Sequence, residues 1–283
     1  MENSESTKRV SLSCLLCLLT LLAGCCIYVG SCDLQAKYVK IVHLTMPLSP
    51  CSSFETQTHN GSITVQGSDV ADCNVTATIV ARARTDEGAM ELADETQVSF
   101  ERMGENLILK IKRPKSLINR SVSVSLDCII PDHVNLKLGS HNGAVKTTSI
   151  TGDIDAATHN GKMTADKVTG TIKLQTHNGG VECREISGDS RLRTHNGSVK
   201  VYYSEAAESV CDISIVTHNG GIELKAPHNY SARIDASTHN GSINTDLPIT
   251  VTGKVSKNKL TGTIGDGQGE LYLETHNGSI RIK

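Results

Sequence analysis

The apolar and polar residues of this chain are ordered by a repeated phrase, His-Asn-Gly, which occurs eight times. Counted from each Asn, the residues six before it and three and five after it are mostly Ile, Leu and Val, whereas the residues between them are mostly polar. A period of two on both sides of a corner predicts two β-strands with one buried face each. Asn and Gly suit the corner because both tolerate a positive φ. The predicted corner residues are Asn60, Gly61, Asn142, Gly143, Asn160, Gly161, Asn178, Gly179, Asn196, Gly197, Asn219, Gly220, Asn240, Gly241, Asn277 and Gly278.

The spacing of these phrases favours a parallel β-solenoid. Four successive phrases stand 18 residues apart, whereas the other gaps range from 21 to 82 residues. Stacked coils require the same residue types at a fixed phase, so we expect coils of about 18 residues that place Met163 beside Val145 and Val181. Asn-Gly between alternating runs is also a strong hairpin signal. An antiparallel meander is therefore the alternative, and it would pair Met163 across its own turn.

Residues 51–132 follow the repeat less regularly than residues 133–283, and we expect both parts to belong to one all-β domain over residues 51–283. A Gly-Glu-Asn stretch at residues 104–106 separates two alternating runs, as in a hairpin. The elements expected in this less regular part are a short helix from Thr85 to Asp94, a hairpin formed by Gln97–Met103 and Leu107–Lys112, and a strand from Val122 to Ile130.

The start of the chain is typical of an export signal. Two basic residues precede a short apolar run, which ends in Leu-Ala-Gly-Cys at residues 22–25. This sequence resembles the lipobox of bacterial lipoproteins, in which small residues admit the chain to a peptidase and the Cys thiol receives a diacylglyceryl group. The resemblance implies a signal peptide over residues 1–24, lipidation of Cys25 and a lipid-anchored tether over residues 25–50.

Two modes of membrane attachment are consistent with this leader. Lipidation of Cys25 would hold the chain on a bacterial membrane, and Cys26 in place of an Asp favours the outer membrane by analogy with bacterial lipoproteins. The alternative is an uncleaved anchor from Val10 to Val29, whose 20 residues are just enough to span a bilayer. In both cases we expect the rest of the chain to be extracytoplasmic.

Composition narrows the partners and the chemistry. With 28 basic and 30 acidic residues, the net charge is −2, and the chain lacks the basic excess typical of nucleic-acid binding. Aromatic residues make up 3% and Trp is absent, which favours a thin core of Val, Ile, Leu, Thr and Ala. Seven of the ten Cys lie beyond the leader and Cys25, without a Cys-x-x-Cys pair. We therefore expect no zinc or redox motif and no cofactor, with at least one thiol free or paired between molecules.

The repeats also carry a resemblance to a known family. The Thr-His-Asn-Gly phrases, the Gly-Asp-Ile-Asp-Ala stretch at residues 152–156 and the lipobox resemble a bacterial family of adhesin-like proteins of unknown function. The resemblance covers about residues 54–283. Members of that family are lipid-anchored, extracytoplasmic β-solenoids with Thr-x-Asn-Gly repeats. The resemblance implies this fold and an adhesive, non-enzymatic role for this chain.

Stacked coils would align the repeated residues in columns about 4.8 Å apart along the axis. The Asn side chains are then expected to bond one another, as in amide ladders. The inward Thr hydroxyls should bond neighbouring hydroxyls or the corner backbone. The outward His column has two interpretations, a metal-binding or pH-sensing ladder and a corner residue that bonds the backbone. A single column offers an ion at most two nitrogens, whereas closed metal sites need three or four ligands, so we expect no metal site.

Three hypotheses about function follow. The first is a non-enzymatic, lipid-anchored cell-envelope adhesin or scaffold whose repetitive β face binds an envelope polymer or protein. The second is a β-helix protein that binds or cleaves polysaccharide; cleavage would need a carboxylate cluster, and Asp153 and Asp189 share a phase but stand two coils apart. The third is a self-assembling envelope element, because an uncapped coil end is an open sheet edge. We expect no catalytic residue and no nucleic-acid partner.

Overall fold

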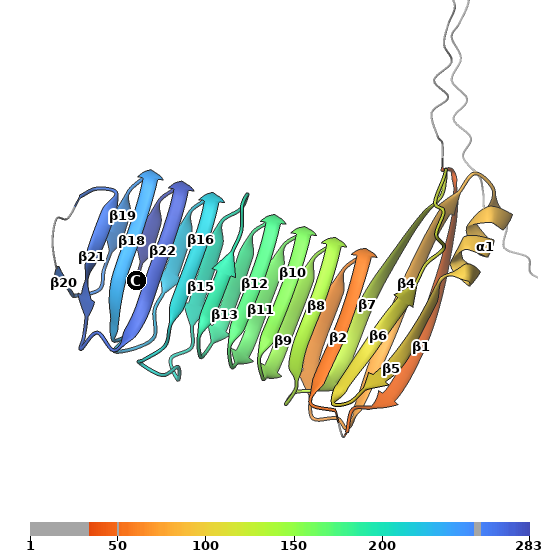
Figure 1. The fold of residues 1–283 in the computed structure, drawn as a ribbon, viewed down its shortest axis with the longest axis horizontal. Coiled ribbons are helices and arrows are strands. Elements are labelled where there is room, and N and C mark those ends of the chain that lie inside the picture. The colour runs from red at the N-terminus through yellow and green to blue at the C-terminus, as the bar shows by residue number, and fades with distance from the viewer. Residues whose placement is uncertain (1–33, 50, 252–255) are drawn as a thin grey trace, which may run out of the picture. The chain divides into compact units, whose positions relative to one another are not determined.

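The computed structural model describes residues 34–49, 51–251 and 256–283. Within these residues the chain winds through two facing β-sheets, so that each coil contributes one strand to each sheet (Figure 1). Met163 pairs in parallel with Val145 on one side and with Val181 on the other. This register confirms the parallel β-solenoid, and the alternative of an antiparallel meander through the repeats is wrong.

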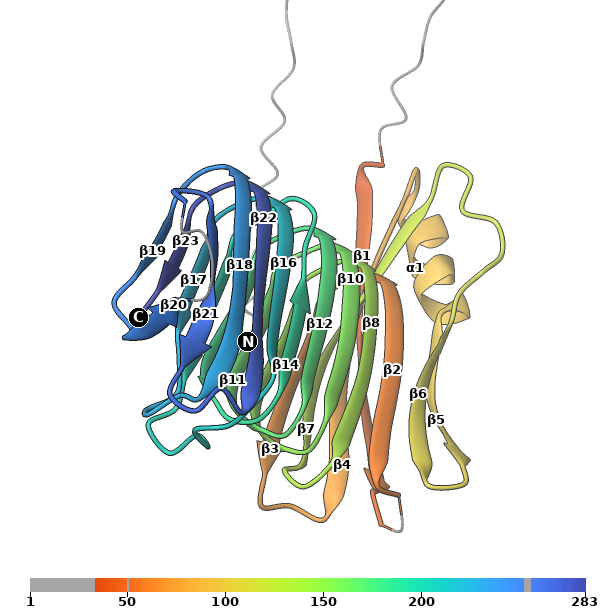
Figure 2. The ribbon, with the colours of Figure 1, turned by 60° about the vertical axis from the view of Figure 1, so that its left-hand side comes forward.

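We call the two sheets sheet A and sheet B. Sheet A contains, in spatial order, β1 (Ala36–Pro47), β4 (Asp72–Ala83), β7 (Ser121–Pro131), β3 (Ile63–Ser68), β9 (Val145–Thr151), β11 (Met163–Thr169), β13 (Val181–Ile186), β15 (Val199–Tyr203), β17 (Ile222–Lys225), β23 (Ile280–Ile282) and β19 (Ile243–Thr245). Sheet B contains β20 (Ile249–Val251), β21 (Lys259–Ile264), β18 (Ala232–Asn240), β22 (Gly269–Asn277), β16 (Ile213–Asn219), β14 (Ser190–Arg193), β12 (Ile172–Asn178), β10 (Ile154–Asn160), β8 (Asn135–Asn142), β2 (Ser53–Asn60), β6 (Asn106–Lys112) and β5 (Gln97–Met103). Figure 2 shows the strands of sheet B side by side.

The spatial order of the coils departs from the sequence order at both ends of the repeat. The coil of β2 and β3 lies directly beside the coil of β8 and β9, although 82 residues separate their corner Asn residues. At the other end, β22 and β23 insert between the coil of β16 and β17 and the coil of β18 and β19 (Figure 1). The long gaps in the repeat are therefore excursions of the chain to the ends of the stack.

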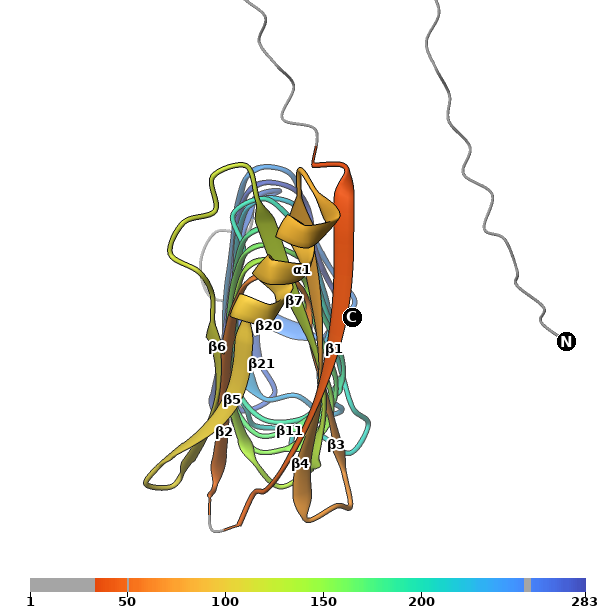
Figure 3. The same cartoon turned by 90° about the vertical axis from the view of Figure 1, so that its right-hand side faces the viewer.

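The end nearest the N-terminus is closed by the less regular part of the chain. Helix α1 (Asp86–Glu95) begins after Thr85, whose hydroxyl oxygen accepts a hydrogen bond from the Gly88 amide at 3.1 Å. Leu92 and neighbouring alanines of α1 are buried, and the helix lies across this end of the two sheets (Figure 3). The expected helix, the hairpin of β5 and β6 and the strand β7 are all present.

Strand β1 corrects the expected position of the tether. The sequence predicts a tether over residues 25–50, but residues 36–47 form β1, which pairs along its whole length with β4. The alternation in this strand is weak because it lies at the edge of sheet A, where most of its side chains are at least partly exposed. The folded part therefore begins before residue 51. The segments expected to be the signal peptide and the acylated Cys25 lie outside the described residues.

The core between the sheets is a set of stacked columns of small aliphatic side chains. Val145, Met163, Val181 and Val199 occupy one column, and each is at most 2% exposed. At the second corner of each coil, Ser149, Lys167 and Glu185 adopt a positive φ of 50 to 56°. This left-handed residue resets the alternation, so that Ile150, Val168 and Ile186 return to the core. No helix in the described part of the chain is long and apolar enough to cross a membrane.

The glycine of the Asn-Gly corner has a different role from the one expected. Gly61 is the one glycine of these corners with a positive φ among the described residues. A Cβ atom on Gly161 would instead stand 2.0 Å from the carbonyl oxygen of Gly143 in the next coil, and one on Gly179 would stand 2.0 Å from that of Gly161. Glycine is therefore required because adjacent coils approach closely at this corner.

Candidate functional site

The repeated His side chains form a continuous ladder on the outer face of sheet B. Each His precedes a corner Asn and points away from the core, whereas the Thr or Ser before it points inward. The centroids of neighbouring imidazole rings are 4.6 to 5.0 Å apart, and most neighbouring rings are nearly parallel. This distance is the spacing of hydrogen-bonded strands, so the stacking follows from the parallel register. Along the axis the ladder contains His59, His141, His159, His177, His195, His218, His276 and His239.

A ladder of Asn side chains at the adjoining corner holds this row in place. The side-chain amide of Asn160 donates to the Oδ1 atom of Asn142 at 2.7 Å, and that of Asn178 donates to Asn160 at 2.8 Å. The same bond links all eight corner Asn residues, including Asn240 and Asn277 of the two C-terminal coils. Each Asn therefore fixes the rotation and the height of its neighbour.

The inward Thr residues complete the corner from inside. Thr158 is 6% exposed, and its hydroxyl donates to the carbonyl oxygen of Gly143 at 3.0 Å. Thr176 makes the corresponding bond to Gly161 at 3.1 Å. These hydroxyls satisfy carbonyls of the neighbouring coil, which is one of the two arrangements that the sequence left open. The His ladder thus stands on a corner with its Asn and Thr side chains already bonded.

A shallow groove runs beside the His ladder and has a volume of about 1020 Å³. Six imidazoles, from His159 to the C-terminal coils, form one wall. The opposite side is lined by the outward residues three positions before each Asn. Several of these side chains are small, and two carry opposite charges. They are Gln57, Gly139, Ala157, Gln175, Arg193, Val216, Glu274 and Ser237.

The groups around the groove differ in how far they are already paired. On the next outward column, Lys137 lies 3.0 Å from Glu55, and Lys173 lies 2.8 Å from Asp155. By contrast, no hydrogen bond within the described residues links the nitrogens of two ladder imidazoles, whose contacts with one another are ring stacking. Their edges are therefore open to a ligand.

The orientation of the imidazoles limits the chemistry of the ladder. Nitrogen lone pairs lie in the ring plane, so two parallel rings direct their lone pairs side by side and not toward a common ion. Among the described residues, no group of three or more His, Cys, Asp and Glu is placed to hold a metal ion. Burial lowers the pKa of His59, and nearby Arg113 and the stacked His141 lower it further. The ladder offers a row of hydrogen-bonding edges that can gain positive charge.

The carboxylates that share a phase in the repeat have a structural role. Asp153 accepts a hydrogen bond from the Thr171 amide at 2.9 Å, and Asp189 accepts one from the Asp212 amide at 2.9 Å. Both bonds join consecutive coils at the second corner. These carboxylates therefore bridge the backbone, as a second ladder on the far side of the coil from the His row.

Sulfur chemistry is also confined to the interior in the described part of the chain. Cys51, Cys73, Cys128, Cys183 and Cys211 are buried and unpaired with one another. Burial raises the pKa of Cys183 to about 12, and that of Cys73 to about 12. A thiolate nucleophile is disfavoured at these positions.

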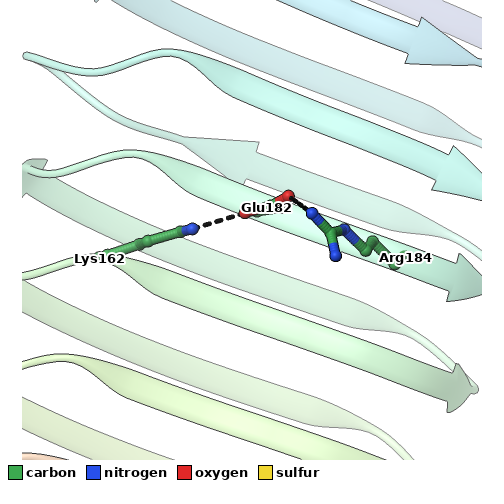
Figure 4. A network of polar contacts seen from close by, with 3 residues as sticks. All are labelled: Lys162, Glu182 and Arg184. Carbon is green, nitrogen blue, oxygen red and sulfur yellow. Dashed lines mark hydrogen bonds and ion pairs between the residues drawn. The ribbon is translucent and has the colours of Figure 1, made fainter.

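The outer face of sheet A is organised by ion pairs and contrasts with the His groove. Glu182 on β13 accepts a hydrogen bond at 2.5 Å from Lys162, which directly precedes β11, and a second one from Arg184 (Figure 4). The bond from Lys162 is the main cause that lowers the pKa of Glu182. Near the C-terminal coils, Lys283 lies 2.8 Å from Glu223. These ion pairs satisfy charged groups on the outer face of sheet A.

The corner Asn residues lie in one row in the structure, whereas the groove beside them was not predicted from the sequence. Cys25, the expected lipidation site, lies outside the described residues. The signal for the groove is the small side chain at Gly139, Ala157 and Ser237, three positions before the Asn. That signal depends on knowing that sheet B presents this position next to the imidazoles.

Comparison with known proteins places this fold in a family. No curated protein matches the chain. A putative cell adhesion protein from Clostridium sporogenes is 14% identical, with a TM-score of 0.39 over 87% of this chain and 99% of that chain. A putative adhesin from Bacteroides fragilis is 10% identical, with a TM-score of 0.43 over 86% and 97%. One from Parabacteroides distasonis is 12% identical, with a TM-score of 0.45 over 86% and 97%. Residues 40–283 match one family over nearly the whole described chain, and the protein therefore belongs to the Toastrack DUF4097 family.

Proposed function

We propose that this protein is a non-enzymatic, lipid-anchored component of the bacterial cell envelope that binds an extended envelope polymer along the His groove. The observation that carries the proposal is the continuous row of eight imidazoles beside a groove of about 1020 Å³. The ladder is about 34 Å long, because its seven steps each equal one strand spacing.

A polymer suits this groove better than a compact ligand does. Small-molecule sites are concave and enclose most of the ligand, whereas this groove is shallow and repeats one set of contacts coil after coil. A chain of identical units can make the same contact at each step. Weak contacts then add, because each later unit binds at a high effective concentration.

Lipidation of Cys25 is the second part of the proposal, and the Leu-Ala-Gly-Cys sequence supports it. One diacylglyceryl group together with further acylation gives stable membrane attachment. The described chain starts only a few residues later, and β1 begins at Ala36. A short tether would keep the solenoid near the membrane surface, where envelope polymers are concentrated.

Self-association is a second candidate function, and the open edge of sheet A favours it. β1 is the outermost strand of this sheet and runs for 12 residues. Val39 is 45% exposed and Ile41 is 57% exposed. A long edge strand with exposed apolar side chains is a template for pairing with a second copy.

The polymer-binding proposal is tested by affinity electrophoresis of the domain without its leader, through gels that contain purified acidic or neutral envelope polysaccharides. Ala157 is exposed between Gly139 and Gln175, so Ala157→Trp fills the groove. We expect at least one polysaccharide to retard the wild type, and about tenfold weaker retardation of Ala157→Trp.

Lys146→Trp is the matched control, because Lys146 is exposed between Thr64 and Thr164 on sheet A. It adds the same side chain to the opposite face and should leave retardation unchanged. Absence of retardation by every polysaccharide, or equal loss in both variants, would overturn the proposal.

A further inference from the structure

We infer that the His groove selects an acidic polysaccharide and binds it more tightly as the pH falls from 7.5 to 5.5. This inference rests on the proposed function and names the class of polymer for the same groove. The polymer would carry a carboxylate on its sugar units, and imidazolium N–H groups would donate to these carboxylates.

The first step is the distance between equivalent contacts. Adjacent imidazoles stand 4.6 to 5.0 Å apart. An extended peptide presents side chains of one face about every 6.6 to 6.8 Å, so an acidic peptide drifts out of phase with the ladder within a few coils. One pyranose ring of an extended glycan advances the chain by about the thickness of one coil. A sugar polymer can therefore keep its units in phase with the coils, so that the carboxylates of alternate units meet every second imidazole.

The charge that the imidazoles can gain favours an acidic polymer. Two stacked imidazolium ions one strand spacing apart would repel each other. A carboxylate bound between them relieves this repulsion and raises their pKa. By linkage, a ligand that raises the pKa of a His binds best below the resulting pKa and weakens as the pH rises through it. An imidazole ordinarily titrates near pH 6.5, so the change falls between pH 7.5 and 5.5.

Other charged side chains lie in and around the His groove. Arg193 lies in the groove on β14, and Glu274 lies two strands away on β22. Arg191 is on β14 in the next outward column, and Lys259 on β21 pairs with Ser237. Asp235 faces outward on β18. Arg113 approaches the His59 end of the ladder.

The pH dependence of binding is therefore assigned to the His residues of the ladder. The other charged residues of the outer column, Lys137 and Lys173, are held by Glu55 and Asp155. Across the corner, Lys162 of sheet A is held by Glu182. The two fixed charges that line the groove, Arg193 and Glu274, have opposite signs, so the change of potential with pH along the groove is set by how many imidazoles are protonated.

A nucleic acid would also be attracted to a protonated ladder, but the rest of the molecule fits it poorly. The net charge of −2 gives no basic footprint for a phosphate backbone. Tyr272 on β22 is 40% exposed, and its hydroxyl donates a hydrogen bond to Glu274. It is the exposed aromatic ring of β22. One ring cannot form the stacking platform that single-stranded nucleic acid requires.

The test uses the domain and soluble probes that share one sugar backbone, polygalacturonate and its fully methyl-esterified form, in which each carboxylate is replaced by a neutral methyl ester. Binding is measured by calorimetry at pH 5.5, 6.5 and 7.5. We expect polygalacturonate to bind at least about tenfold more tightly at pH 5.5 than at pH 7.5, because more than one imidazole gains a proton. The ester should bind weakly and without this pH dependence.

Variants locate the effect on the ladder. The double change His177→Gln and His195→Gln removes two central imidazoles of the six that line the groove and should reduce the pH dependence by about a third. Gln is compatible with the outer face, because Gln175 already occupies it. The control changes His133→Gln and His228→Gln remove two exposed imidazoles elsewhere and should have no effect. Thermal unfolding of each variant verifies its fold, and the wild-type comparison needs no variant.

Each outcome separates the two proposals. Equal binding of both probes at all pH values would overturn the selection of acidic chains and leave polymer binding in place. A third probe, poly-L-glutamate, is measured under the same conditions; if it bound as tightly as polygalacturonate or more tightly, the groove would be assigned to an acidic peptide and the choice of a polysaccharide overturned. Binding of no probe would overturn this inference, whereas retardation by a different neutral polysaccharide in gels would still support the proposed function.

Discussion

Replacement of Gly179 by Ala tests the close contact of adjacent coils at the Asn-Gly corner. The added Cβ would stand 2.0 Å from the carbonyl oxygen of Gly161 and 2.5 Å from its carbon. The coils must then separate by about 1.5 Å to reach an ordinary contact distance. That movement stretches the bond from the Gly161 amide to the Asn178 carbonyl, now 3.0 Å, and the bond from the Thr176 hydroxyl to the Gly161 carbonyl, now 3.1 Å.

The expected cost follows from these contacts. Overpacking in a closely packed region costs about 1 to 3 kcal/mol, and two weakened hydrogen bonds add about 1 kcal/mol each. We therefore expect Gly179→Ala to lower the free energy of unfolding by about 3 to 5 kcal/mol. Urea unfolding followed by far-UV circular dichroism measures this difference.

Gly180→Ala is the matched control at the neighbouring position. Its Cβ would meet the Ser198 carbonyl oxygen at 3.2 Å, and other coils already carry Ala144 or Ser198 at the same phase. This change should cost less than about 1 kcal/mol. If Gly179→Ala were as mild as Gly180→Ala, the corner would not require close approach, and the steric reason for a glycine at this phase of every coil would be refuted.

Three further predictions concern the anchor, the ion pairs and the sheet edge. Cys25→Ser should leave an unacylated precursor and release the protein from membranes, which mass spectrometry of the N-terminus and fractionation will show. Because the pKa of Glu182 is lowered, its pairing stabilises the fold above pH 4.5, and this contribution is lost as the pH falls through the lowered pKa; Glu182→Gln should cost less than about 1 kcal/mol at pH 7 and progressively less in acid, by thermal unfolding. Ile41→Lys should abolish any concentration-dependent dimer seen by sedimentation.

The regular part of the fold was predictable because one 18-residue period runs through four consecutive phrases. The alternation predicts that Val145, Met163 and Val181 are buried, and the fixed period favours parallel stacking over the meander that the alternation also allows. The match of residues 40–283 to the Toastrack DUF4097 family confirms the family resemblance found in the repeats. Local signals also placed α1, because Thr85 caps a helix with acidic residues in its first turn.

The order of the terminal coils could not be predicted from the sequence. Nothing in the local pattern of β22 shows that it pairs with β16 and β18, because all three carry the same phase of apolar residues. The backbone excursion through β20 and β21 decides the order, and its residues lack the repeat. The tether boundary failed for a related reason, since the edge strand β1 buries too little to show strong alternation.

The groove was not predicted from the sequence, because it lies between two different columns of outward side chains. The sequence gives the His ladder and, separately, small residues such as Gly139 and Ala157. Only the parallel register brings these residues side by side with imidazoles along the whole face of sheet B. A period of two predicts which side chains face outward, but it does not predict how far the side chains of neighbouring columns extend from the sheet.

The most direct test of the central claim is an NMR titration of the His side chains with the polysaccharide that binds. Imidazole resonances of uniformly labelled protein are followed while the polymer is added. The account predicts shifts at the six His residues that line the groove, with His133 and His228 unchanged. Shifts confined to residues of sheet A, or binding without any change at the ladder, would contradict it.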